Sequence, residues 1–220
     1  MNIYTFYEKI YESDDSAQLE MIQIWKESWS YYGWTPIVLD MKDVMHHVLY
    51  EKMKNVCSKF PTTNNPIYEL YCFLRWLSMD NRGGWFTDYD IINYGFKPID
   101  YGNKVVTTSY QLGGNTIYGP QNFYKEIINA ILSYKIDEMD FINIDGVKTP
   151  HISDMHLLTN LMIKKLLIVD ECLDQEKCYG LDGYKNCKLI HYANSYIPKN
   201  KNRLSIIKDD LKSFNLTNII

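Results

Sequence analysis

Two aspartates, Asp88 and Asp90, are separated by one residue at the end of the apolar run Trp85-Phe86-Thr87. Carboxylate oxygens are hard ligands that suit small divalent cations. On an extended segment, residues i and i+2 project from the same face, so both carboxylates would converge on one ion. The pair therefore predicts a cation site with open positions for phosphate oxygens, although a bare Asp-x-Asp also occurs as a solvated strand end.

The residues before this pair strengthen the prediction of a site. Gly83 and Gly84 end a predicted helix that carries Arg75, and glycine allows the backbone to pass close to a ligand or a neighbouring strand. In open α/β sheets, ligands bind beyond the carboxyl ends of strands. Asp88 and Asp90 directly follow the carboxyl end of the predicted strand Trp85-Phe86-Thr87.

The first forty residues predict a βαβ unit. Residues 3–7 form an apolar strand pattern, and 13–16 (Ser-Asp-Asp-Ser) supply capping groups for a helix that Gly33 ends. Residues 36–40 form a second strand pattern that finishes on Asp40. Strand, helix and strand in this spacing favour parallel strands with a right-handed crossover.

Periodicity places the remaining elements along the chain. It predicts helices over residues 44–56, 67–79, 121–134, 156–167 and 204–214, and strands over 104–109, 115–118 and 189–192, with a turn at 112–115. No repeat or linker interrupts this pattern. We expect one α/β domain over residues 1–220, with a mixed, mostly parallel sheet flanked by helices.

Composition narrows the possible partners. The formal net charge of -4 argues against a nucleic-acid partner bound by phosphate neutralisation. The five cysteines include no Cys-x-x-Cys pair, which favours reduced thiols in a cytoplasmic protein (the host cytoplasm if it is viral) over a zinc or disulfide framework. No segment reaches the roughly 18 apolar residues of a membrane span.

The segment from Leu74 to Ile91 resembles the Asp-x-Asp, sugar-binding region of GT-A glycosyltransferases, in particular the short bacterial, viral and fungal enzymes. The arginine, the glycine pair, the following aromatic and both acids match. Trp85-Phe86 replaces the usual Ile-Tyr, and residues 79–82 are more polar than in the family. The resemblance implies a GT-A-like fold with a nucleotide-sugar and metal-binding half (1–95) and an acceptor-side half (96–220).

The resemblance also implies roles for individual residues. Asp88 would contact the ribose and orient the metal, Asp90 would be the main ligand of Mn²⁺ or Mg²⁺, and Arg75 would brace the acids or the donor sugar. The other residues expected to contact the nucleotide are Thr5, Phe6, Tyr7 and Tyr89. Asp40 is either a further contact to the base or the cap of a helix or turn.

Three later segments supply further candidates. Residues 189–196, Leu-Ile-His-Tyr-Ala-Asn-Ser-Tyr, resemble a late segment of the same family, which makes His191 either a metal ligand or a structural histidine. The basic residues Lys199, Lys201 and Arg203 lie either in a segment that closes on the diphosphate or in a solvated loop. Asp154 is either a helix N-cap or the carboxylate that deprotonates the acceptor.

The resemblance implies a metal-dependent enzyme that transfers a sugar from a nucleotide sugar, in particular a UDP-sugar, to a glycan or glycoprotein hydroxyl. A minimal bacterial or viral catalytic domain, such as an algal-virus capsid glycosyltransferase, fits the chain length. Two alternatives are a nucleotidyltransferase or phosphohydrolase using the same acids, and a non-enzymatic carbohydrate-binding module. The absence of a glycine-rich phosphate loop disfavours the first, and the βαβ opening disfavours the second.

Overall fold

The chain opens with the predicted βαβ unit. The computed structural model describes residues 1–10, 15–109, 116–136, 141–144 and 146–219. Strand β1 (Asn2–Phe6) leads to helix α1 (Ser16–Tyr31) and strand β2 (Thr35–Leu39), and the two strands pair in parallel. The predicted capping residues 13 and 14 lie outside the described residues. The bounds of the three elements agree with prediction to a few residues.

A six-stranded sheet forms the centre of the molecule, in the order β2-β1-β3-β6-β5-β9. Its other members are β3 (Gly84–Thr87), β5 (Val106–Thr107), β6 (Thr116–Gly119) and β9 (Glu171–Cys172). Within this sheet, β6 runs against its two neighbours, whereas the β1–β2, β1–β3 and β5–β9 pairs are parallel. The predicted mixed, mostly parallel α/β sheet is confirmed.

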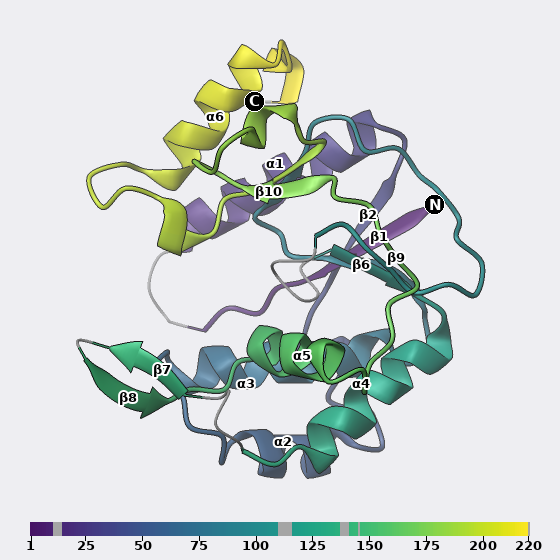
Figure 1. Cartoon of the computed structure of the whole chain (residues 1–220). Helices are drawn as coiled ribbons and strands as arrows, with labels where there is room; N and C mark the ends of the chain where they lie inside the picture. The colour runs from purple at the N-terminus through teal and green to yellow at the C-terminus, as the bar shows by residue number, and fades with distance from the viewer. Residues whose placement is uncertain (11–14, 110–115, 137–140, 145, 220) are drawn as a thin grey trace.

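Helices cover one face of this sheet (Figure 1). They are α2 (Tyr50–Cys57), α3 (Pro66–Leu74) with the 3₁₀ segment η2 (Arg75–Met79), α4 (Gln121–Ser133) and α5 (Asp154–Ile163). Their buried side chains form one hydrophobic core, in which Trp76 stacks on Tyr124 and tilts against Phe86. This core fixes η2, and therefore Arg75, against strand β3.

The opposite face carries α1, α6 (Arg203–Ser213) and a second, three-stranded sheet (Figure 1). That sheet has the order β10 (Glu176–Cys178), β11 (Leu189–His191) and β4 (Ile91–Asn93). A tryptophan-rich core, with Trp25, Trp29, Trp34 and Trp85, fills the space between the layers. Since β3 belongs to the large sheet and β4 to the small one, the chain crosses between the two sheets at residues 88–90.

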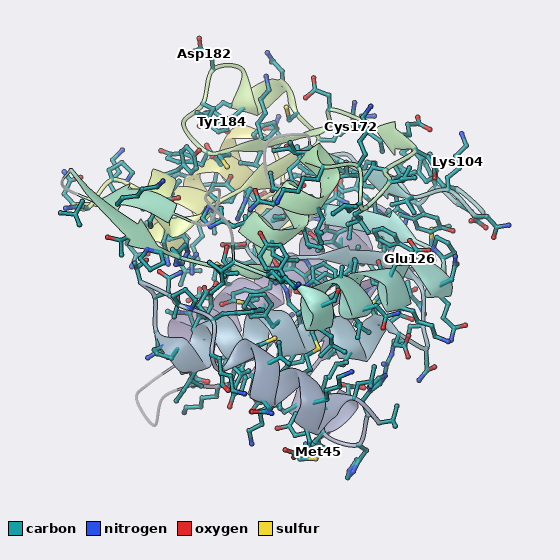
Figure 2. The ribbon with its side chains drawn as sticks, turned by 60° about the horizontal axis from the view of Figure 1, so that its bottom comes forward. Met45, Lys104, Glu126, Cys172, Asp182 and Tyr184 are labelled. Atoms are coloured by element: carbon teal, nitrogen blue, oxygen red, sulfur yellow. The ribbon has the colours of Figure 1, made fainter. Side chains whose placement is uncertain are left out.

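Some predicted elements differ from the structure. The helix predicted over residues 44–56 begins only at Tyr50, because side chains hold the preceding segment in turns: His47 accepts a hydrogen bond from the Leu49 amide and lies 3.1 Å from an Asp80 oxygen. Met45, in that segment, projects from the outer surface (Figure 2). The strand predicted over 104–109 reduces to β5, and the turn predicted at 112–115 lies outside the described residues.

Four short strands had no counterpart in the prediction. They are β9, β10 and the hairpin of β7 (Phe141–Ile144) with β8 (Val147–Pro150). β9 and β10, with two and three residues, are too short to show a period-two pattern, so only pairing with a neighbour defines them. In the part of the chain that the structure describes, no helix is both long and apolar enough to cross a bilayer.

Candidate active site

Asp88 and Asp90 lie in a tight turn between the two sheets. The Asp88 carbonyl accepts a hydrogen bond from the Ile91 amide at 3.1 Å, as in a β-turn. The segment is therefore not extended, and the expectation that strand pleating aligns the two acids is wrong. The turn itself brings the carboxylates together, at the point where β3 leaves the large sheet.

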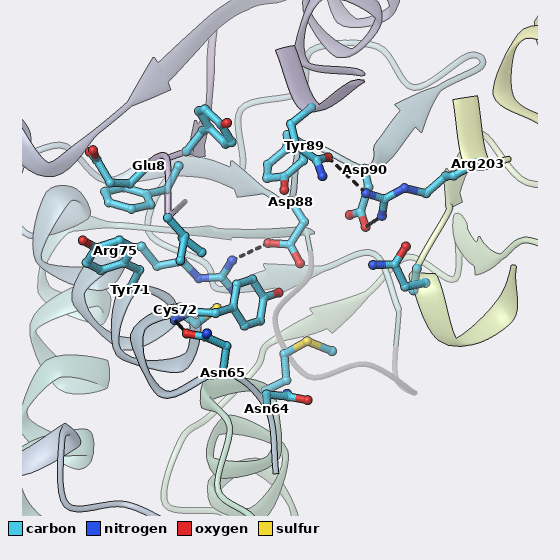
Figure 3. Close-up of a pocket in the computed structure, with 18 of the residues that line it drawn as sticks. Glu8, Asn64, Asn65, Tyr71, Cys72, Arg75, Asp88, Tyr89, Asp90 and Arg203 are labelled. Carbon is cyan, nitrogen blue, oxygen red and sulfur yellow. Dashed lines mark hydrogen bonds and ion pairs between the residues drawn. The ribbon is translucent and has the colours of Figure 1, made fainter. Parts of the chain in front are cut away.

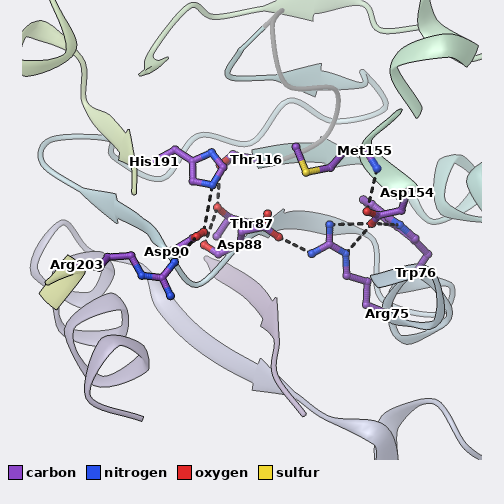
Figure 4. Close-up of polar contacts among 10 residues, drawn as sticks. All are labelled: Arg75, Trp76, Thr87, Asp88, Asp90, Thr116, Asp154, Met155, His191 and Arg203. Carbon is purple, nitrogen blue, oxygen red and sulfur yellow. Dashed lines mark hydrogen bonds and ion pairs between the residues drawn. The ribbon is translucent and has the colours of Figure 1, made fainter. Parts of the chain in front are cut away.

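Strand pairing brings His191 to this turn from a hundred residues away. Strand β11 pairs antiparallel with β4, which places His191 opposite Ile91, and the Tyr192 amide donates to the Asp90 carbonyl at 2.9 Å. His191 Nε2 lies 3.3 Å from Asp90 Oδ1 (Figure 4). Its Nδ1 lies 3.9 Å from Cys178 Sγ. The imidazole thus turns Nε2 toward the acids.

The three side chains form a candidate cation site. One ligand atom from each of Asp88, Asp90 and His191 lies within 4.8 Å of the other two. Two carboxylates and one imidazole form a donor set that suits Mn²⁺, whereas Mg²⁺ prefers oxygen ligands throughout. The residues present therefore fit a divalent cation, with Mn²⁺ as the better chemical match.

Arg75 connects Asp88 to a second buried acid. Arg75 Nη1 lies 2.5 Å from Asp88 Oδ1, while its Nε and Nη2 lie 3.0 and 2.8 Å from Asp154 Oδ2 (Figure 4). The same Asp154 oxygen accepts a hydrogen bond from Trp76 Nε1, and Asp154 Oδ1 accepts one from the Met155 amide. The arginine is therefore fixed between two carboxylates.

This arrangement leaves Asp154 poorly placed to act as the general base that deprotonates the acceptor. Both oxygens are engaged, its side chain is 3% exposed, and it does not line the pocket described below. Nor is it the N-cap of α5, because Ser153 accepts the hydrogen bond from the His156 amide. The geometry supports neither predicted role and makes Asp154 the anchor of Arg75.

Asp90 has an arginine partner of its own. Arg203, the first residue of α6, places Nη1 3.2 Å from Asp90 Oδ2 and 3.4 Å from the Tyr192 carbonyl. Its Nη2 lies 3.4 Å from Gln18 Oε1. The other two basic residues predicted here, Lys199 and Lys201, are exposed and do not line the pocket.

The charges in this cluster shift one another's pKa. Burial raises the pKa of Asp88; the Arg75 guanidinium opposes that shift and the Asp90 carboxylate adds to it. Burial also disfavours ionisation of Asp90, but His191 and Arg203 outweigh it and lower the pKa. Burial disfavours the His191 imidazolium, but the Asp90 carboxylate outweighs it and raises the pKa well above its usual range. A cation that binds His191 must therefore displace a proton.

A pocket of about 690 Å³ opens over these residues (Figure 3). Asp88, Asp90 and His191 line it together with three of the predicted nucleotide contacts, Phe6, Tyr7 and Tyr89. Tyr7 and Tyr89 meet edge to face at 5.7 Å, and the Tyr7 hydroxyl donates to Asp15 at 2.9 Å. The pocket has the size and aromatic character of a small-molecule site.

Two predicted contacts lie elsewhere. Thr5 is fully buried beneath the pocket wall and does not line it. Asp40 forms a capping box with Asp43 at the start of the 3₁₀ segment η1 (Met41–Asp43): its side chain accepts from the Lys42 amide at 2.7 Å. Of the two predicted roles for Asp40, the structure shows the cap.

Several pocket residues were not predicted from the sequence. They are Glu8, Lys9, Ile10, Asp15, Gln18, Asn64, Asn65, Tyr68, Tyr71, Cys72, Met155 and the segment 193–196. The helix cap at Asn65, which accepts hydrogen bonds from the Ile67 and Tyr68 amides, was a readable signal for the start of α3. The sequence offered no sign that this cap also faces the cation site.

Comparison with known proteins finds a family of unknown function and a weakly similar structure. Residues 1–98 match a family described as a domain of unknown function (DUF8765), and no curated protein matches the chain. Among solved structures, the chain is similar to one titled PaToxG glycosyltransferase, with 13% identical residues and a TM-score of 0.45. That similarity covers 75% of this chain and 69% of the other. We therefore infer the function from the site geometry.

Proposed function

We propose that this chain is a metal-dependent glycosyltransferase. It would transfer a sugar from a nucleoside-diphosphate sugar, in particular a UDP-sugar, to a hydroxyl of a glycan or glycoconjugate. The observation that carries the proposal is the convergence of Asp88, Asp90 and His191 on the wall of a 690 Å³ pocket lined with tyrosines. The sequence resemblance of residues 74–91 to the sugar-binding region of such enzymes, which includes Asp88 and Asp90, supports it.

The proposal gives each group a physical task. Asp88, Asp90 and His191 would hold Mn²⁺ or Mg²⁺, which when bound would neutralise charge on the departing nucleoside diphosphate. Arg75 holds Asp88 in position because Asp154, which accepts a hydrogen bond from Trp76, anchors the guanidinium on its other side. A ligand held this way needs little rearrangement when the ion and donor arrive.

The aromatic end of the pocket would receive the nucleotide. Tyr7 follows β1 and Tyr89 lies between the two acids, so both rings are fixed to the same end of the sheet. A base or ribose can pack on such rings while the cation site holds the phosphates. Burial and the Asp15 carboxylate raise the pKa of Tyr7 to about 12, so its hydroxyl stays protonated at neutral pH.

The bond that breaks distinguishes this proposal from its enzymatic alternatives. A glycosyltransferase cleaves the bond between the anomeric carbon and the diphosphate, so slow donor hydrolysis yields a nucleoside diphosphate and free sugar. A nucleotidyltransferase or phosphohydrolase cleaves a phosphate bond and yields a nucleoside monophosphate. Chromatography of the products from a panel of nucleotide sugars with Mn²⁺ separates these outcomes.

Binding is tested first, through thermal stabilisation by UDP and by UDP-sugars with and without Mn²⁺. A ligand at 100 times its Kd stabilises the native state by about 2.7 kcal/mol, which corresponds to a shift of several degrees in Tm. We expect stabilisation that requires Mn²⁺ and is lost in Asp90→Asn. Asp209→Asn, the same change at an exposed position on α6, is the matched control. Stabilisation by free glycans alone would favour a binding module instead.

A further inference from the structure

The two acids of the cation site have arginine partners of different kinds. Arg75 is 9% exposed in its side chain and contacts Asp88 on one side and the buried Asp154 on the other. Arg75 would leave Asp154 as an unpaired buried charge if it moved away, which is strongly unfavourable. Asp154 therefore anchors Arg75 beside Asp88.

Arg203 lacks such an anchor. Among the residues that the structure describes, Asp90 is the one acid within ion-pair distance of its guanidinium. Its remaining partners, the Tyr192 carbonyl and the Gln18 side-chain oxygen, are neutral and lie at 3.4 Å. The guanidinium thus depends on Asp90 for its charged contact, and it can move without leaving another buried acid behind.

Both carboxylate oxygens of Asp90 have a nitrogen partner within ion-pair distance. Oδ1 lies 3.3 Å from His191 Nε2, and Oδ2 lies 3.2 Å from Arg203 Nη1 (Figures 3 and 4). The side chains of Asp90 and Arg203 are 17% and 16% exposed, so water screens their charges weakly. A divalent ion on Asp90 would share one carboxylate with a guanidinium a few ångströms away, and the two positive charges would repel.

We propose that Arg203 is an internal counter-cation for Asp90 and that a divalent metal ion competes with it for this carboxylate. The inference rests on the proposed function for the ion at this site and for the nucleotide that follows it. With an ion on Asp90, Arg203 Nη1 would lose its contact with the carboxylate, while Nη2 would keep its contact with Gln18 Oε1. Its released donors then face the pocket, where an anionic substrate can accept them.

This competition predicts effects of opposite sign on two ligands. Arg203→Gln removes the competing charge, so we expect the Kd for Mn²⁺ alone to fall by about three- to tenfold. The same variant should weaken binding of UDP at saturating Mn²⁺, because the released guanidinium is lost. If Arg203 merely supported the fold, its substitution would weaken the binding of both Mn²⁺ and UDP.

The experiment uses the full chain and measures Mn²⁺ binding by electron paramagnetic resonance, followed by UDP titration calorimetry. Lys212→Gln, the same charge change at the other end of α6, controls for loss of one positive charge. Its Mn²⁺ affinity should change less than twofold. Arg203→Lys keeps a competing charge and should stay close to the unsubstituted protein.

The outcomes separate this inference from the proposed function. Mn²⁺ binding that is unchanged or weaker in Arg203→Gln would overturn the competition, even if UDP still binds with the metal. Tighter Mn²⁺ binding without any nucleotide binding would support the competition and contradict the glycosyltransferase. If Lys212→Gln tightens Mn²⁺ binding as much as Arg203→Gln, a general charge effect explains the result and the inference fails.

Discussion

Glu69 on α3 is a buried acid just behind the pocket wall. Its side chain is 4% exposed; Oε1 accepts a hydrogen bond from Asn64 Nδ2 at 2.9 Å, while Oε2 has no partner among the described residues. Burial raises its pKa from 4.5 to about 7, the Asn64 bond opposes the shift, and Asp154 adds to it. Asn64 lines the pocket, so the hydrogen bond between Asn64 and Glu69 links the protonation state of the Glu69 carboxyl to the pocket wall.

Stability should therefore depend on the charge of Glu69. The folded protein binds this proton more tightly than the unfolded chain, so the resulting stability is present below about pH 4.5 and is lost as pH rises through about 7. Glu69→Gln mimics the neutral acid and keeps an acceptor for Asn64. We expect the variant to be more stable than the unsubstituted protein. The difference in free energy of unfolding should be small at pH 4.5 and about 2 kcal/mol at pH 8.

Urea denaturation at the two pH values measures this difference. Glu126→Gln, at an exposed position on α4 (Figure 2), provides the matched change and should show the same stability as the unsubstituted protein at both. An equal gain for Glu69→Gln at both pH values would show that the carboxyl does not titrate in this range.

At the scale of elements, the join between η2 and β3 sets the position of the Asp-x-Asp turn. Gly83 has φ +64°, and a Cβ there would lie 3.0 Å from the backbone nitrogen of Gln121, where β6 passes into α4. A side chain at position 83 would therefore crowd the first residue of α4, which would have to shift by a few tenths of an ångström. The expectation that the glycine pair permits close backbone approach fits this contact.

We predict that Gly83→Ala destabilises the protein more than Gly102→Ala does. Gly102 has nearly the same backbone angle, φ +62°, but no atom lies within 4 Å of the position that a methyl group would occupy there. Backbone strain alone costs about 1–2 kcal/mol at either position. At Gly83 the contact with Gln121 adds to that cost, so its free energy of unfolding should fall further by about 1 kcal/mol or more. Equal losses in urea denaturation would show that α4 yields to the added methyl.

At the scale of the whole molecule, residues from both sides of the predicted division at 95 share the same sheets. Strand β3 pairs with β6, and β4 pairs with β11. The cation site likewise combines Asp88 and Asp90 with His191, and Arg75 is anchored by Asp154. We propose that residues 1–220 fold as one unit and that neither half forms the site alone.

A fragment of residues 1–98 should therefore fail to fold. It would leave β3 and β4 without their antiparallel partners and would expose Trp76, which stacks on Tyr124 at 6.2 Å in the intact chain. We expect poor dispersion in an amide NMR spectrum and no cooperative thermal transition, with the full chain as the reference. A dispersed spectrum with a sharp transition would contradict the single-unit proposal.

Much of the fold was predictable because its signals are local. The βαβ opening, the stop at Gly33 and the helix over 121–134 each depend on periodicity or on one residue with special backbone freedom. The segment before Tyr50 was mispredicted as helix because His47 forms side-chain contacts with Asp80, thirty-three residues away. No local pattern records such a contact.

For the site, the sequence by itself determined the donor chemistry: two acids beside a glycine pair, an upstream arginine and a later histidine. The tertiary structure decided how they meet. A turn rather than a strand aligns the acids, β11 brings His191 to them, and burial makes Asp154 an anchor instead of a surface base. The reason is physical, since residue type sets what a side chain can bind, whereas pairing and packing across the chain set which partners reach it.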